Sequence, residues 1–179
     1  MLGWLVKGRL ASFQKEFNYD PQYVLDIYEA SPRAFFRFSW MSGLAAHREE
    51  VSKEAWYAAK LVATLAEDCG PCTQLVVTMA EREGVSAPSL RSVLDGNEAA
   101  MPPDAALGFK FAKAVLQRDI VAADRLRTEV VSRWGKKGLV SMALTIAASR
   151  VFPAVKYALG HGHACTQVNL AGSEMAVHR

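Results

Sequence analysis

Residues 52–84 read SKEAWYAAKLVATLAEDCGPCTQLVVTMAEREG, and this stretch carries the strongest structural signal in the chain. It opens with Ser52, a good N-cap residue, and apolar side chains then recur at helical spacing as far as Ala66. After Glu67 and Asp68 the helical spacing begins again and runs to Gly84, a residue type that commonly ends helices. We therefore predict two consecutive helices, with the two cysteines of the Cys-Gly-Pro-Cys motif opening the second.

Helix signals continue on both sides of this stretch, whereas strand signals are scarce. Asp20-Pro21 and Ser31-Pro32 each place a capping side chain before a proline, which is a common start of a helix. Beyond Gly84, apolar spacing and the positions of glycine and proline predict further helices over residues 88–96, 104–117, 119–134, 138–149 and 152–159. The predicted fold class is all-α.

The length and the linkers favour one domain. A chain of 179 residues suits a single domain, which buries roughly 70% of the surface of its unfolded chain and needs no disulfide or metal to fold. The clearest linker, Met101-Pro102-Pro103, fits a loop better than a domain boundary. We expect a single domain over residues 1–179, with residues 1–50 as an N-terminal helical extension and residues 160–179 as a tail.

Charge argues against a nucleic-acid partner. The chain has 21 Lys and Arg against 18 Asp and Glu, a net charge of +3. The densest basic stretch, Lys110 to Lys137, is interrupted by Asp119, Asp124 and Glu129. Because a nucleic-acid surface needs a stripe of one sign, a solvated helical face is the better interpretation.

The apolar segments indicate a cytoplasmic protein that does not span a membrane. The longest apolar run, Leu139 to Ser149, is shorter than the roughly 20 residues that cross a bilayer. At the start of the chain, Lys7 and Arg9 follow the apolar residues, which is not the order of a secretory signal. Three cysteines without a leader favour a reducing compartment.

Cys69 and Cys72 form the most specific motif in the chain. The C-x-x-C spacing brings the two sulfur atoms close enough to form a disulfide. Cys69 would lie at the start of a helix, where free N–H groups and the helix dipole stabilise a thiolate. A thiolate attacks peroxides and disulfides, and a neighbouring thiol can then resolve the product. The motif therefore predicts a redox-active disulfide, Cys69–Cys72, with no other cofactor.

The context of the motif resembles one redox family. Thioredoxin shares Cys-Gly-Pro-Cys but requires a strand before it, whereas residues 56–66 predict a helix. A helix, an acidic turn and C-x-x-C at the start of a second helix resemble the AhpD-like alkylhydroperoxidase branch of the carboxymuconolactone decarboxylase superfamily. The resemblance is clearest over residues 55–83. It implies an AhpD-like helical bundle, a homo-oligomer such as a trimer or hexamer, and an antioxidant peroxidase whose cysteine pair takes electrons from a lipoyl or similar dithiol carrier.

The family's proton relay has no counterpart here. Its histidine, four residues after the second cysteine, corresponds to Val76, and its glutamate, twelve residues before the first cysteine, corresponds to Tyr57. Glu67 is the preferred substitute base, although Glu67 and Asp68 also suit a purely structural cap at the helix start. Other candidates are Glu54, His47, His161 and His163. Helix geometry favours Cys69 as the attacking cysteine, and the family's usual assignment favours Cys72.

Three alternatives use the same residues. Cys69 and Cys72 could bind a structural zinc ion with His161, His163 and Cys165, although the two groups are far apart in the sequence. Cys165 could instead be a buried apolar side chain or a third, resolving thiol. The chain could also be a non-enzymatic all-α oligomerisation domain. The aromatic cluster, which contains Phe35, Phe36, Phe38 and Trp40, could line a pocket for an apolar hydroperoxide, but we expect it to form core or subunit contacts.

Overall fold

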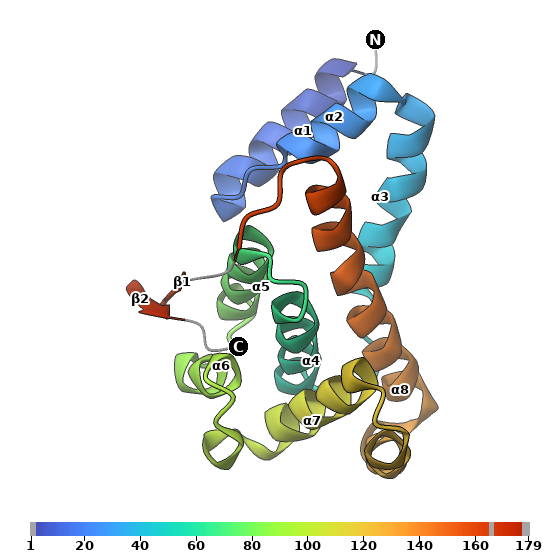
Figure 1. Cartoon of the computed structure of the whole chain (residues 1–179), viewed down its shortest axis with the longest axis vertical. Helices are drawn as coiled ribbons and strands as arrows, with labels where there is room; N and C mark the ends of the chain where they lie inside the picture. Colours follow the sequence, from blue (N-terminus) through green and yellow to red (C-terminus); the bar gives the residue numbers. More distant parts are fainter. Residues whose placement is uncertain (1–2, 165–166, 177–179) are drawn as a thin grey trace.

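Most of the chain is helical. The structure, a computed structural model, describes residues 3–164 and 167–176 (Figure 1). Its helices are α1 (Gly3–Phe17), α2 (Gln22–Ala30), α3 (Pro32–Ala46), α4 (Lys53–Leu65), α5 (Gly70–Arg82), α6 (Ala87–Leu94), the short 3-10 helix η1 (Glu98–Ala100), α7 (Pro103–Gln117) and α8 (Ile120–Ala158). The two strands are β1 (Gln167–Leu170) and β2 (Ser173–Ala176). The predicted all-α class is confirmed.

Ser31 and Ser52 act as the caps that the sequence predicted, whereas Asp20 does not cap α2. The N-cap of α2 is Pro21, and Asp20 Oδ1 accepts a hydrogen bond from the Gln22 nitrogen instead. The side chains of Ser31 and Ser52 accept hydrogen bonds from backbone N–H groups in the first turns of α3 and α4. Ser86 caps α6 in the same way, one residue before its first helical residue. Gly84 has a left-handed backbone conformation, with φ of 76°, just after α5. Local sequence signals therefore set these helix ends.

The core is formed where α4 packs against α7 and α8. The α4–α7 crossing is very close at Gly108, because a Cβ atom built there would lie 2.2 Å from the carbonyl oxygen of Ala55. Ala55, Ala59 and Leu61 of α4 have no exposed surface. Small residues on the two facing helices thus let the backbones approach, and α4 becomes the central helix of the molecule.

Helices α1 to α3 occupy residues 3–46, within the segment that we expect to be an N-terminal helical extension. In Figure 1, α1 and α2 lie next to each other at one end of the molecule, and α3 runs along α8. Helix α1 also contacts α5, the helix that carries the cysteine motif. Arg82 of α5 forms an ion pair with Glu16 of α1 at 2.9 Å. The extension therefore packs against the cysteine-bearing helix.

The last three predicted helices all fall within α8, which has one kink. We expected breaks at Gly135, Gly138 and Pro153, and the break at Gly135 is confirmed, because the chain departs from helical geometry there with φ of 65° and ψ of −174°. Glycine adopts this conformation without the penalty that a Cβ would bring. The breaks expected at Gly138 and Pro153 are wrong, because both residues lie inside α8. Gly138 has a packing role, since a Cβ there would lie 2.4 Å from the Cβ of Trp134.

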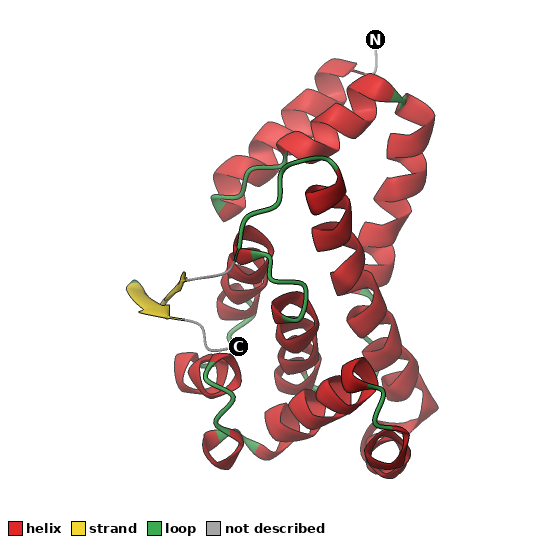
Figure 2. Ribbon diagram, in the orientation of Figure 1, coloured by secondary structure: helices red, strands yellow, loops and turns green. Residues whose placement is uncertain are grey.

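The tail contains a β-hairpin that the sequence analysis missed. Strands β1 and β2 pair antiparallel, with Val168 opposite Met175 (Figure 2). Val168, Leu170 and Met175 are buried, and β1 contacts α5. A pair of four-residue strands is marginal on its own, so packing against α5 stabilises this hairpin.

Helix α8 has the length and apolar composition of a membrane-spanning helix. Within its most apolar 18-residue stretch, 44% of the residues are buried inside the molecule. Core helices of globular proteins have the same properties. The absence of a membrane span and the cytoplasmic location therefore stay predictions.

Candidate redox site

The cysteine motif lies where the sequence predicted it, at the start of α5. Cys69 is the N-cap residue, and Pro71 lies in the first turn. Cys69 and Cys72 form a disulfide with their Cα atoms 5.3 Å apart. Cys69 has no exposed surface, and 5% of Cys72 is exposed. The pair is therefore a buried disulfide at a helix N-terminus.

The backbone around Cys69 is held on both sides. Its carbonyl oxygen accepts hydrogen bonds from the backbone nitrogen of Thr73, at 2.9 Å, and from the Thr73 hydroxyl, at 3.0 Å. The Gly70 nitrogen donates to the carbonyl oxygen of His163 at 3.0 Å. Because Gly70 N–H is used and Pro71 has no N–H, α5 offers a Cys69 thiolate fewer free donors than an ordinary helix start.

Cys72 lies on the wall of a large cavity, with a volume of about 1250 Å³. One face of α5 contributes Cys72, Val76 and Met79, which are three or four residues apart. Helix α4 contributes Tyr57, Lys60 and Thr64 at the same spacing. Helices α1, α2 and α3, the connecting segments next to them, and the residues Ser149 and Phe152 of α8 also contribute to the wall. A ligand in this cavity would therefore meet Cys72.

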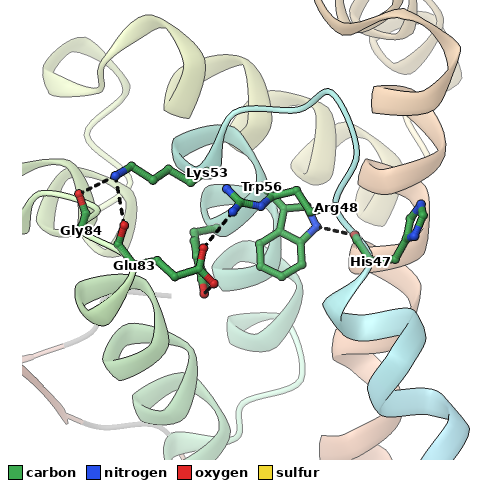
Figure 3. A network of polar contacts seen from close by, with 7 residues as sticks. His47, Arg48, Lys53, Trp56, Glu83 and Gly84 are labelled. Carbon is green, nitrogen blue, oxygen red and sulfur yellow. Dashed lines mark hydrogen bonds and ion pairs between the residues drawn. The ribbon is translucent and has the colours of Figure 1, made fainter.

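The two positions of the missing relay lie on this wall. Tyr57 donates a hydrogen bond to Oε1 of Glu83 at 2.8 Å. Arg48 pairs with Oε2 of Glu83 at 3.0 Å (Figure 3). Burial, followed by the hydrogen bond to Glu83, raises the pKa of the Tyr57 phenol above its ordinary value. Val76 also lines the cavity. Tyr57, Glu83 and Arg48 thus form a hydrogen-bonded chain on the cavity wall.

A second group of contacts fixes the ends of this chain. Lys53 donates to the carbonyl oxygens of Glu83 and Gly84, both at 3.0 Å. The indole nitrogen of Trp56 donates to the carbonyl oxygen of His47 at 3.1 Å (Figure 3). These contacts hold the C-terminal end of α5 and the segment after α3 against α4.

Lys60 is a buried lysine on the cavity wall. Its Nζ donates to the carbonyl oxygen of Ala45 at 2.7 Å and lies 3.8 Å from the centre of the Trp56 ring. Burial lowers the pKa of Lys60 from 10.5 to about 7, and the charge of Glu83 partly opposes this change. Lys60 is therefore a cation that can lose its proton near neutral pH.

Glu67, the predicted base, forms an ion pair with Arg150 of α8. It is partly buried but is not among the residues that line the cavity. Asp68 has a left-handed conformation, with φ of 52°, and its carbonyl oxygen accepts a hydrogen bond from Tyr157. Glu54 lies in the first turn of α4. A catalytic role for Glu67 stays a prediction.

The candidate zinc ligands are only partly brought together. His161 Nε2 lies 2.7 Å from Oδ2 of Asp26, and His163 is exposed. Cys165 lies outside the described residues. Within residues 3–164 and 167–176, no group of three or more His, Cys, Asp and Glu side chains is arranged to hold a metal ion.

The sequence analysis missed Arg48, Lys60 and Glu83, which form the polar part of the cavity wall around Tyr57. Lys60 follows Tyr57 by three residues, and Glu83 follows Cys72 by eleven, so helical spacing places each of them on the same face as its partner. Helical spacing was therefore the sequence signal that could have identified these residues. Spacing alone does not reveal that the face with Tyr57 and the face with Cys72 line the same cavity.

Comparisons with protein-family models, with curated proteins and with solved structures find no match for this chain. The resemblance to AhpD-like proteins therefore rests on the residues themselves and stays a prediction.

Proposed function

We propose that this chain is a thiol-dependent oxidoreductase whose Cys69–Cys72 dithiol reduces peroxides or disulfides. The observation that carries the proposal is the disulfide at the start of α5 with Cys72 on the wall of a large cavity. A C-x-x-C pair that can cycle between dithiol and disulfide is a two-electron reductant. The cavity supplies a place for its substrate.

Cavity access favours Cys72 as the attacking thiol. Its thiolate would attack one oxygen of a hydroperoxide, breaking the O–O bond and forming a sulfenic acid, while the alkoxide takes a proton to become an alcohol. The Cys69 thiol would then displace water from the sulfenic acid and close the disulfide. A dithiol carrier restores the reduced pair by thiol–disulfide exchange and is itself oxidised.

The first experiment measures the pH dependence of iodoacetamide alkylation on the reduced protein, with peptide mass spectrometry reporting each cysteine separately. We expect Cys72 to titrate below the free-thiol pKa of about 8.5. We also expect one equivalent of hydrogen peroxide to close the Cys69–Cys72 disulfide. Replacing Cys69 or Cys72 by Ser should abolish this closure, whereas the control Cys165→Ser should keep it.

Two results would contradict the proposal. Cysteines that react only after a chelator is added would indicate the zinc site. Cysteines with ordinary titration and no closure by peroxide, with or without a chelator, would indicate a structural all-α domain.

A further inference from the structure

The cavity has an extended apolar wall. It contains six of the eight phenylalanines of the chain: Phe13, Phe17, Phe35, Phe36, Phe38 and Phe152. Several of these rings pack edge to face, with centroid distances of 5.4 Å for Phe35–Phe36 and 5.5 Å for Phe38–Phe152. Phenylalanine side chains offer no hydrogen bonds, so a polar group seated against them would lose its bonds to water. The part of a ligand that meets this wall must be apolar.

Lys60 gives the same cavity a buried cation. Only 6% of its surface is exposed. An ammonium has three N–H donors, and among the described residues one acceptor for them is present, the Ala45 carbonyl oxygen. No carboxylate within residues 3–164 and 167–176 forms an ion pair with Lys60. The charge of Glu83 offsets the burial of the ammonium only in part, so the pKa of Lys60 is still about 7, and an anion in the cavity would stabilise the protonated form.

The anionic side chains of the cavity wall already have partners of their own. Glu83 is already bound by Arg48 and Tyr57, and Glu16 is paired with Arg82. Arg9, the remaining charged residue of the wall, is an exposed cation. With Lys60 protonated, the wall carries four cations and two anions. The excess of positive charge favours an anionic ligand.

We propose that this cavity binds aliphatic monocarboxylates, with the carboxylate on the Lys60 ammonium and the chain against the phenylalanine wall. The volume of about 1250 Å³ exceeds the roughly 300–1,000 Å³ of pockets that hold drug-sized ligands, so the cavity has room for a long chain. Cys72 lines the same cavity. Naming the hydroperoxides of such acids as substrates rests on the proposed function, whereas the binding itself does not.

Calorimetric titration with dodecanoate and with dodecanol tests the site, with dodecanoate below micelle formation, dodecanol below its solubility limit, and the buffer at pH 6, below the pKa of about 7 of Lys60. Wild-type protein should bind the acid at least about tenfold more tightly than the alcohol, because only the carboxylate has a negative charge to pair with the ammonium. Lys60→Met should remove this preference. Lys156→Met is the matched control, because Lys156 is also buried over aromatic rings but does not line the cavity.

Each result decides the question. Equal binding of acid and alcohol by wild-type protein, retention of the preference in Lys60→Met, or the absence of dodecanoate binding overturns the inference. Circular dichroism shows whether the Lys60→Met variant is folded. If the variant does not fold, the comparison of acid with alcohol on wild-type protein alone decides whether the inference holds.

Cysteine closure by hydrogen peroxide is measured on the same wild-type protein. Dodecanoate binding with inert cysteines would overturn only the proposed function, and reactive cysteines without a preference for the acid would overturn only this inference.

Discussion

Two buried lysines contact aromatic rings in similar ways but face different surroundings. Lys60 Nζ lies over Trp56 of the same helix, and Lys156 Nζ lies 4.6 Å from the centre of the Tyr19 ring. Burial lowers the pKa of both lysines. The rings recover part of the cost of burying a cation. The cavity, however, makes Lys60 the lysine that a ligand can reach.

The depressed pKa of Lys60 predicts stability that rises with pH. Between pH 7 and about 10, an unfolded lysine keeps its proton while folded Lys60 has lost it, so the unfolded state binds more protons and unfolding becomes less favourable as pH rises. The slope from this residue should approach about 1.4 kcal/mol per pH unit. Lys60→Met should flatten the curve of unfolding free energy against pH, measured by urea denaturation of the oxidised protein.

The tyrosines limit this window. Burial raises the pKa of Tyr23 to about 12 and also raises those of Tyr19 and Tyr57. Unfolded tyrosines therefore ionise first above about pH 10, and stability should fall there. Lys113→Met is the control, because Lys113 is exposed. Below pH 10 this variant should keep the wild-type slope of unfolding free energy against pH. Parallel curves for wild-type protein and Lys60→Met would contradict the role given to Lys60.

Glu67 and Glu83 offer a second test at the level of single residues. If Glu67 is a base, Glu67→Gln should slow disulfide closure by hydrogen peroxide by about 10²-fold or more. If it serves only the ion pair with Arg150, the variant should close at the wild-type rate and lose less than about 1 kcal/mol of stability. Glu83→Gln is the comparison on the cavity wall. We measure the closure rate from pH 6 to 9, since an acid–base role changes the profile.

At the level of elements, the contact of α4 with α7 organises the site. Helix α4 carries Tyr57 and Lys60 on its cavity face and Ala55 on the face that meets α7. Helix α5 carries Cys72 and lies beside α4. The hairpin supports α5 from the other side, because the Gln74 side chain exchanges two hydrogen bonds with the backbone of Asn169. Helices α4 and α5 are thus held in place by contacts on their faces opposite the cavity, with α7 and with the hairpin.

Gly108→Ala tests how tightly α4 and α7 pack. The new Cβ would meet the Ala55 backbone, which cannot move as a flexible side chain does. Overpacking of this kind typically costs about 1–3 kcal/mol. Gly43→Ala in α3 is the matched control, because no atom lies within 4 Å of its Cβ position, and it should stabilise the helix by about 0.5–1 kcal/mol. Urea denaturation midpoints measure both changes, and equal shifts would contradict the close crossing.

At the level of the whole molecule, α3 presents apolar side chains to solvent. Phe36, Trp40 and Leu44 are four residues apart, and their exposed fractions are 46%, 80% and 41%. Residues at this spacing lie on one face of a helix. An exposed apolar strip of this kind is typical of a subunit contact. The homo-oligomer stays a prediction, and this strip is where we expect its subunits to meet.

We expect Trp40→Glu to shift the protein to a smaller species in size-exclusion chromatography with light scattering. A buried carboxylate without a partner would oppose association through this strip. Val121→Glu is the control, because Val121 of α8 is also exposed, at 83%, but lies outside the strip. A monomeric wild-type protein would contradict the expected trimer or hexamer. Dissociation by Val121→Glu alone would place the contact on α8.

The sequence predicted those structural features that depend on interactions between residues close together in the chain. Ser31, Ser52 and Gly84 mark helix ends because a cap bonds to backbone groups within a few residues. The position of the Cys69–Cys72 pair at a helix start is local in the same sense. Pro153 misled the prediction, because packing of the surrounding helix outweighs its preference for ending one.

The cavity, by contrast, depends on residues that are far apart in the chain. Glu83 meets Tyr57 across 26 positions and Arg48 across 35, and the His163 carbonyl reaches the start of α5 from beyond α8. Periodicity shows which face of a helix is apolar but not which other face it meets. Composition and local spacing therefore determined the helical class and the cysteine pair. The joining of Cys72, Lys60 and the phenylalanine wall in one cavity arose from packing, because contacts between distant residues leave no periodic signal in the sequence.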